Sequence, residues 1–479
     1  MSLAVAIAWL LPFVAGIALW LALVPRRGPG WVADAGGHGI VFGMLSAAAC
    51  TSLFARADTT QAWMHAAPTL AVGAALAVAF AWRRSRAPAL SIPCKVENAN
   101  KWILALLVVA LASLLFRGWL MLREIWLRPT FPWDAWDAWA VKSKTWFLLG
   151  HYAPFVSMRD WLAHPAQELY TGVAWAYPAT LAWMQVWFAS AAGGWIEPQV
   201  NLPWFALWIG LLLAHYGQWR ALGLDRVRAV AAMYVLGSLP LLDVHVALAG
   251  YADLWLATLL GFAVLAWLRW RRERDAGQLA LAIACAALLP AIKLEGAVWL
   301  LLFAAVAIYG VLPRRWRRMA LGGAVGMLLL LAFVRHIALP VPALGWVEIS
   351  YSRIVVPALG TYGMHFDAGA LASLLNSLFV QPNWHLLWWL APGIALWRWR
   401  ALRDDAALRH LGAFVVLGLA FLFFLFTCTD ASRWAESYTA VNRLILQLVP
   451  ATVTVLAMMC REQGSDGTRP SPAASPDPA

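Results

Sequence analysis

The feature that most constrains this chain is a series of long apolar runs separated by short polar segments. A helix that spans a membrane needs about 20 mostly apolar residues. Runs of this kind lie at 3–24, 38–55, 62–82, 101–122, 202–218, 229–247, 253–268, 278–292, 296–312, 319–339, 384–397, 409–427 and 441–459. Because 62% of the 479 residues are hydrophobic and only 13% are charged, a water-soluble core is excluded. The sequence predicts an all-α polytopic membrane protein, a bundle of about thirteen transmembrane helices.

The basic residues indicate topology rather than a nucleic-acid partner. The formal net charge of +12 comes from short clusters at the ends of apolar runs. These clusters are RR at 26–27, RRSR at 83–86, RWRRER at 269–274, RRWRR at 314–318 and RWRALR at 398–403. Cytoplasmic loops of membrane proteins carry such an excess of lysine and arginine. We therefore expect a multi-pass protein of the cell inner membrane with its N-terminus outside, and we expect no binding of nucleic acid.

One apolar segment, YPATLAWMQVWFASAA at 177–192, tests this alternation. If it crossed the membrane, every later basic cluster would lie outside, against the positive-inside rule. We therefore predict that 177–192 is a re-entrant or juxtamembrane helix. The polar segments 123–176, 243–253, 293–295, 340–383 and 428–440 then face outward. The polar stretch 461–479 is predicted to be a disordered cytoplasmic tail.

The first outer loop gathers carboxylates, tryptophans and lysines within WDAWDAWAVKSK, residues 133–144. Asp134 and Asp137 are spaced i, i+3, which places both on one face of an α-helix. Such a pair can supply a general base, and Lys142 and Lys144 can hold a phosphate. The alternative is an amphipathic helix that lies on the membrane and turns its aspartates to water.

Other ionisable residues also stand at predicted outer ends of helices. Asp253 opens an apolar run in GYADLWLA, Lys293 and Glu295 interrupt another in IKLEGAVW, and Arg443 begins the last run in NRLILQLVP. Their simpler explanations are a favourable helix start, a local ion pair, and an arginine that reaches to the interface. No spacing in the chain specifies a metal site, a nucleotide site or a nucleophile.

The order and sidedness of these motifs resemble the GT-C class of integral-membrane glycosyltransferases. Within that class the chain looks similar to the protein O-mannosyltransferase and lipid A aminoarabinose transferase group. The resemblance covers 101–460 and leaves three N-terminal transmembrane helices, within 1–100, outside it. It implies a GT-C-like catalytic module with outer-face loops and juxtamembrane helices.

The resemblance also implies a reaction in the cell envelope. Such enzymes pass a sugar from a polyprenyl-phosphate donor to a glycan, lipid or protein acceptor, on the periplasmic or exterior face. By analogy the base is Asp134 or Asp137; this chain has D-A-W-D-A-W where relatives carry adjacent acidic residues, so the choice stays open. Substrate contacts fall on Lys142, Lys144, Asp253, Lys293, Glu295 and Arg443. No cofactor and no metal are expected.

Two other functions fit a polytopic chain. A transporter or lipid flippase would carry its charges in mid-membrane on paired broken helices, whereas the charges here lie at helix ends. A scaffold that kept the fold without chemistry is the third possibility.

Overall fold

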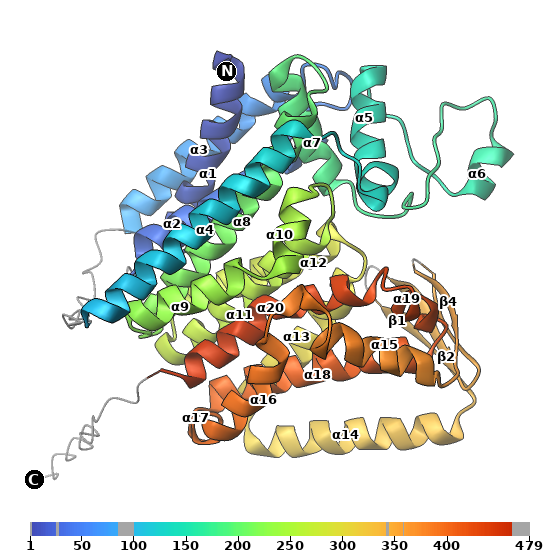
Figure 1. The fold of residues 1–479 in the computed structure, drawn as a ribbon. Helices are drawn as coiled ribbons and strands as arrows, with labels where there is room; N and C mark the ends of the chain where they lie inside the picture. Colours follow the sequence, from blue (N-terminus) through green and yellow to red (C-terminus); the bar gives the residue numbers. More distant parts are fainter. Residues whose placement is uncertain (1, 25–27, 85–99, 342–343, 358, 462–479) are drawn as a thin grey trace, which may run out of the picture.

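The computed structural model describes residues 2–24, 28–84, 100–341, 344–357 and 359–461, apart from the side chains of 84 and 327–333. The basic pair at 26–27, part of the cluster at 83–86, and all but the first residue of the predicted tail therefore lie outside the described residues. The described part of the chain is a helical bundle with one small sheet at its end (Figure 1).

The first half of the chain contributes eight helices and one short π-helix. Their bounds are α1 Leu3–Leu23, α2 Trp31–Phe54, α3 Ala62–Arg84, α4 Lys101–Leu127, η1 Ala135–Trp139, α5 Ala140–Leu149, α6 Met158–Ala163, α7 Thr180–Ala192 and α8 Glu197–Ala221. The next helices are α9 Arg226–Gly237, α10 Pro240–Ala247, α11 Asp253–Glu273, α12 Ala276–Ile292, α13 Gly296–Val311 and α14 Arg314–Phe333. After the strands come α15 Ala368–Phe379, η2 Pro382–Trp384, α16 Leu387–Trp397, α17 Trp399–Asp404, α18 Ala406–Cys428, α19 Ser432–Glu436 and α20 Val441–Met459.

Side-chain caps fix where several helices start. The carboxylate of Asp405 accepts from the backbone N–H groups of Ala407 and Leu408, at 2.9 and 3.0 Å, at the start of α18. Asp367 and Asp225 cap α15 and α9 in the same way. These contacts satisfy backbone donors that the first turn of a helix leaves free.

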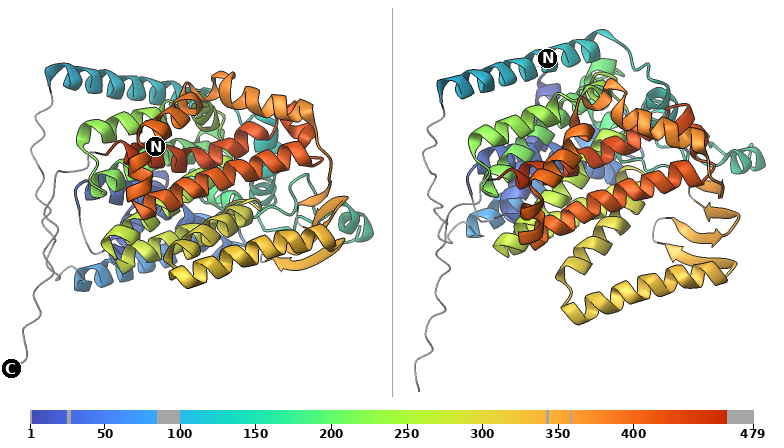
Figure 2. Two further views of the ribbon diagram at one scale, coloured as in Figure 1. Left: turned by 90° about the horizontal axis from the view of Figure 1, so that it is seen from below. Right: turned by 60° about the horizontal axis from the view of Figure 1, so that its bottom comes forward.

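The core is centred on α11. Every residue from Asp253 to Arg269 is buried, and α11 packs against α8, α12, α18 and α20. By contrast, only 11% of the apolar window of α4 is buried; α4 crosses the front of the bundle in Figure 1 and lies along its upper edge in Figure 2. A helix that is apolar all round and buried on every side forms the centre of a membrane bundle, whereas α4 presents its apolar surface to lipid.

Among the described residues, eight helices are long and apolar enough to cross a membrane. The count becomes nine if α9 and α10, which meet at a bend of 61°, form one broken span. The chain is therefore a multi-pass membrane protein by helix length and hydropathy. Each of the thirteen predicted runs overlaps a helix, but the helices at 276–292, 296–311 and 387–397 are shorter than a full span. Thirteen spans are thus not shown.

The segment 336–363 differs most from the sequence-based expectation. The predicted span 319–339 is wrong at its end, because α14 stops at Phe333 and a strand begins at His336. The predicted outer loop 340–383 contains most of a four-stranded antiparallel sheet in the order β1-β2-β3-β4, followed by α15. Strand bounds are β1 His336–Val341, β2 Gly345–Ser350, β3 Arg353–Val356 and β4 Gly360–Gly363. Strand pairing satisfies the backbone of a segment that hydropathy alone assigns to a span or a loop.

The segment 177–192 forms α7, a helix of only 13 residues. All of its residues from Leu181 to Ala191 are buried, against α1, α2, α3, α5 and α8. Its length of roughly 20 Å is too short for a hydrocarbon core of roughly 30 Å. Among the described residues, α7 is not one of the helices long enough to cross a membrane, and it lies within the bundle. Its re-entrant or juxtamembrane placement stays a prediction.

Candidate functional site

Arg443 joins the last helix to the first polar loop. Its Nη1 forms an ion pair and hydrogen bond with Oδ2 of Asp134, a residue 309 positions earlier in the chain. The guanidinium also lies over the ring of Tyr251, 5.2 Å from the ring centroid. A guanidinium has five N–H donors, and the Nε of Arg443 is buried without a partner among the described residues. Arg443 therefore binds Asp134 through Nη1 and still has an N–H group, at Nε, that could donate a further hydrogen bond.

Asp253, the first residue of α11, forms a second ion pair, with Lys293. Its Oδ1 accepts hydrogen bonds from Nζ of Lys293 at 2.9 Å and from Nε2 of Gln447 at 2.6 Å. The same Nζ lies 3.2 Å from Oε1 of Glu295. Lys293 and Glu295 come from the turn between α12 and α13, and Gln447 stands one helical turn after Arg443 on α20.

The two ion pairs form one cluster, because the charge of Arg443 acts on both Asp253 and Lys293. The predicted residues Asp134, Asp253, Lys293, Glu295 and Arg443 are therefore brought together from four distant segments of the chain. Two cations and three carboxylates give this cluster a formal net charge of −1. We call these five residues the polar cluster.

Protonation within the polar cluster follows from its burial and its charges. Burial lowers the pKa of Lys293, but the carboxylates of Asp253 and Glu295 outweigh that effect and raise its pKa overall. Burial raises the pKa of the Tyr177 phenol, and the negative charge of Glu295 raises it further. At neutral pH Lys293 is therefore a cation and Tyr177 a neutral phenol that can donate.

Tyr177 extends the polar cluster and was missed from the sequence. Its hydroxyl donates to Oε1 of Glu295 at 3.0 Å, and its ring packs against Trp139 with centroids 5.0 Å apart. The YP dipeptide that opens 177–192 carries the tyrosine, but a single tyrosine beside an apolar helix does not by itself indicate a site. Gln447 was also missed, because nothing in LILQLVP distinguishes a glutamine that faces a carboxylate from one that faces lipid.

The ammonium of Lys142 is bonded within the protein. Its Nζ is buried and donates to the backbone carbonyls of Trp175 and Tyr177, at 3.0 and 2.6 Å. Burial lowers the pKa of Lys142 to about 8. The ammonium therefore fixes the segment that carries Tyr177, and the substrate contact at Lys142 stays a prediction.

Lys144 also lies apart from the polar cluster. Its Nζ is 3.3 Å from Oε1 of Glu197, and the same carboxylate accepts from the indole N–H of Trp195 at 2.9 Å. The side chain of Lys144 is about half exposed. It belongs to an ion pair at the start of α8.

The structure separates the two aspartates of WDAWDAW. Residues 135–139 of the motif form the π-helix η1, and Asp134 lies just before it. In a π-helix hydrogen bonds run from i to i+5 and each turn is wider than in an α-helix. The prediction that Asp134 and Asp137 share one α-helical face is therefore wrong. Asp134 contacts Arg443, while Asp137 has no hydrogen bond or ion pair to any other described residue.

Gly250 lets η1 approach the start of α11. Its φ of +122° lies in a region that favours glycine, and a Cβ at this position would lie 2.5 Å from the Cβ of Ala135. The GYAD motif therefore needs its glycine for both backbone shape and space. This contact places Tyr251 and Asp253 beside the residue that follows Asp134.

Several buried polar atoms around the polar cluster have no partner among the described residues. They are Asp253 Oδ2, Glu295 Oε2, His245 Nε2 and Arg443 Nε. Nδ1 of His245 lies 2.9 Å from the carbonyl of Leu241, an acceptor, so Nδ1 carries the proton and Nε2 is an acceptor in the neutral ring. Three acceptors and one donor are thus free to meet a ligand with hydroxyl groups.

A pocket lies at the end of α4, and none of its lining residues belongs to the polar cluster. Its lining includes Arg128, whose Nε lies 2.6 Å from a carboxylate oxygen of Glu124, and Thr130, whose hydroxyl donates to Glu197 at 2.5 Å. Leu248 and Ala249, which directly precede Gly250, form the opposite wall. No group of three histidine, cysteine, aspartate or glutamate residues with metal-binding geometry occurs in the described segments.

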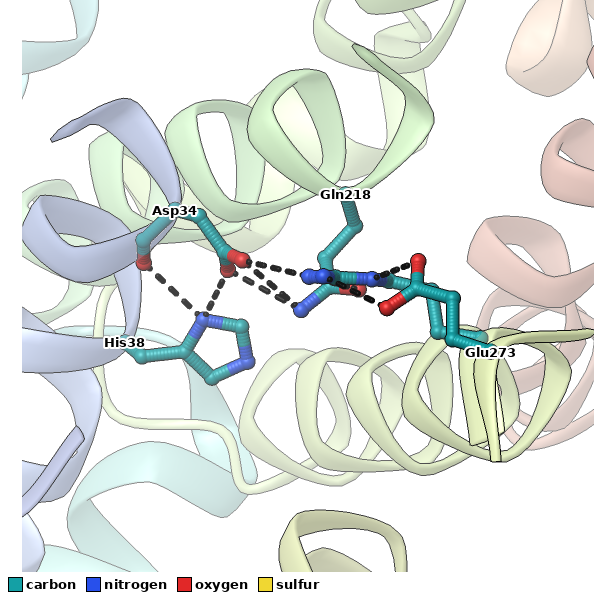
Figure 3. A network of polar contacts seen from close by, with 5 residues as sticks. Asp34, His38, Gln218 and Glu273 are labelled. Carbon is teal, nitrogen blue, oxygen red and sulfur yellow. Dashed lines mark hydrogen bonds and ion pairs between the residues drawn. The ribbon is translucent and has the colours of Figure 1, made fainter. Parts of the chain in front are cut away.

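A different buried charge network lies between α2, α8 and α11 (Figure 3). Oxygens of the Asp34 carboxylate lie 2.8 Å from Nδ1 of His38, 2.9 Å from Nε2 of Gln218 and 3.2 Å from Nη1 of Arg269. Arg269 also binds Glu273 through Nε, at 2.9 Å. Because Arg269 stands roughly 24 Å along α11 from Asp253, this network belongs to the opposite end of the bundle.

Comparison of the chain with protein-family models, curated proteins and solved structures found no match. The resemblance to GT-C glycosyltransferases therefore stays a prediction from sequence motifs.

Proposed function

We propose that this protein is a membrane glycosyltransferase of GT-C-like architecture. It would transfer a sugar from a polyprenyl-phosphate donor to an acceptor at the outer face of the cell inner membrane. The observation that carries the proposal is the convergence of Asp134, Asp253, Lys293 and Arg443 from distant motifs into one cluster. Had these residues lain at opposite ends of the helices, no single site could use them.

Asp134 is the better candidate for the base. General-base catalysis needs a carboxylate held at a defined position, and Arg443 holds Asp134 while Asp137 is unsupported. In the proposed step the acceptor hydroxyl gives its proton to Asp134 and its oxygen bonds to the anomeric carbon. The bond from that carbon to the phosphate oxygen breaks, and the polyprenyl phosphate leaves with the electron pair. The product has inverted anomeric configuration.

The cations of the cluster would stabilise the leaving phosphate. Charge develops on the departing oxygen, so fixed donors aimed at it lower the barrier. Arg443 is suited to this role because it has an unused buried N–H beside the one that binds Asp134. The unpartnered acceptors at His245 and Asp253 would receive hydroxyl groups of the sugar.

The test uses the full chain in proteoliposomes that contain a panel of polyprenyl-phosphate sugars and candidate acceptors. Release of free polyprenyl phosphate reports transfer whichever sugar is used. We expect Asp134→Asn to lose roughly 10²–10⁴-fold in rate, and Asp137→Asn to stay close to wild type. Asp160→Asn, an exposed change in α6, is the control.

If both aspartate variants keep full turnover, Asp134 is not the base. The second candidate function is transport of a lipid-linked sugar, which the broken helix pair α9 and α10 favours. If the protein is such a transporter, labelled donor would cross the bilayer without any release of polyprenyl phosphate.

A further inference from the structure

A cluster of arginines lies at the end of the bundle opposite the polar cluster. Arg271 stands near the end of α11, and the positive charges of Arg274 and Arg317 act on it. Arg317 comes from the first turns of α14, and His410, near the start of α18, is within reach of Arg271, Arg317 and Arg409. We call Arg271, Arg274, Arg317, Arg409 and His410 the arginine cluster.

Two of these arginines are drawn together by one backbone oxygen. The carbonyl of Gly310 accepts from Nη1 of Arg271 at 2.8 Å and from Nη2 of Arg317 at 2.9 Å. The guanidinium of Arg317 also lies 5.8 Å from the ring centroid of Tyr309, and that of Arg271 lies 5.2 Å from the ring of Trp267. Like charges held this closely repel one another unless an anion lies between them.

The nearby carboxylates do not neutralise the arginine cluster. The carboxylate whose charge acts on Arg271 is that of Asp405, and it is paired with Nη2 of Arg272 at 2.5 Å. Glu273 is bonded to Arg269. A buried atom without a partner among the described residues remains at Arg271 Nε.

The start of α14 adds a second, independent attraction for an anion. Its sequence opens RRWRR, and no acidic residue lies in its first turn. The N-terminus of a helix carries a partial positive charge and free backbone N–H groups, so cations there are unfavourable and an anion is favoured. Arg314, Arg315 and Arg318 are exposed around Trp316, whose side chain is 45% exposed.

We propose that the arginine cluster and the start of α14 form a binding site for the phosphate headgroup of an anionic phospholipid. The position favours a lipid over a free anion. Trp316 is an amphipathic ring of the kind found at the membrane interface. Beyond it, α14 continues as an apolar helix on the outside of the bundle, where acyl chains can lie (Figures 1 and 2).

The experiment measures retained lipid by native mass spectrometry of the full chain in detergent. The probes are dioleoylphosphatidylglycerol, dioleoylphosphatidylcholine and inorganic phosphate. We expect the wild-type chain to retain phosphatidylglycerol in preference to phosphatidylcholine. The double variant Arg271→Gln/Arg317→Gln should bind phosphatidylglycerol roughly tenfold more weakly or worse.

The matched control is Arg403→Gln/Arg56→Gln, which removes the same charge from two exposed arginines outside the cluster. This control should bind phosphatidylglycerol like the wild type. If the double variant of the cluster does not fold, Arg409→Gln at its edge gives a milder test with the same expected direction. Equal retention by wild type and by a folded cluster variant would overturn the proposal, as would saturation by inorganic phosphate with no preference for the lipid.

Discussion

Single residues in the polar loop act through partners that sequence cannot name. Lys142 is the clearest case, because its ammonium is buried and bonded to two backbone carbonyls of the segment that carries Tyr177. From the sequence alone, a lysine next to an acidic motif is predicted to bind an anion such as a phosphate. The structural role of Lys142 depends on the position of the loop at Trp175, which lies 33 residues later in the chain.

The lowered pKa of Lys142 should be visible in the pH dependence of the free energy of unfolding. Burial lowers the pKa of Lys142 from 10.5 to about 8, so in that window the unfolded chain binds more protons than the folded chain. The free energy of unfolding should therefore rise between about pH 8 and pH 9.5, by about 1–2 kcal/mol. Chemical unfolding of the wild type in micelles would measure this rise, and Lys142→Met should lack it.

The upper limit of that experiment is set by Tyr177. Burial raises the pKa of Tyr177, so the folded chain keeps a proton that the unfolded chain loses above about pH 10. Stability should fall there as pH rises. If Lys142→Met keeps the full rise below that limit, another group is responsible.

At the scale of single residues, the sequence predicted the polar cluster better than its surroundings. Asp134, Asp253, Lys293, Glu295 and Arg443 were expected near one another because each stands at an outer helix end, and the structure brings them together. The uncharged residues that bond to the cluster, Tyr177 and Gln447, do not stand out in the sequence. Their polarity becomes meaningful only once the opposing carboxylate is in place.

Among the helices and strands, hydropathy predicts some elements and misses others. Long apolar helices were predictable, since their length and composition follow from the membrane. The π-helix at WDAWDAW and the sheet at 336–363 were not, because both depend on local hydrogen bonds. Gly345 and Gly360, with φ of +83° and +117°, begin β2 and β4 and mark two of the turns there.

Gly250→Ala tests whether the approach of η1 to α11 matters. An added Cβ would meet Ala135 and would also require an unfavourable backbone angle, so we expect destabilisation by more than about 1 kcal/mol. Activity should fall further than stability, because Asp134 would move away from Arg443. Both are measured on purified protein, by thermal unfolding and by release of polyprenyl phosphate.

Gly73→Ala is the control for that variant. A Cβ at Gly73 would meet nothing within 4 Å, and the residue lies inside α3. This change should be neutral or stabilising. If Gly250→Ala behaves in the same way, the close contact with Ala135 is not needed.

For the whole molecule, the main prediction concerns sidedness. Since α7 is too short to cross, α8 should run inward and the turn at Gly223 should lie in the cytoplasm. A reporter fused after Gly223 should therefore give a cytoplasmic signal. An outer signal would reverse the orientation of every later helix and would place the polar cluster on the cytoplasmic side.

The Asp34 network has a consequence for how the chain is made. Asp34 and His38 enter the membrane early, yet Gln218 and Arg269 follow 184 and 235 residues later. At roughly 5–20 residues per second, synthesis of that interval takes on the order of 10–50 s. During this delay a carboxylate within α2 lacks its final neighbours, so the newborn segment must be sheltered by water or by an insertion factor until α11 arrives.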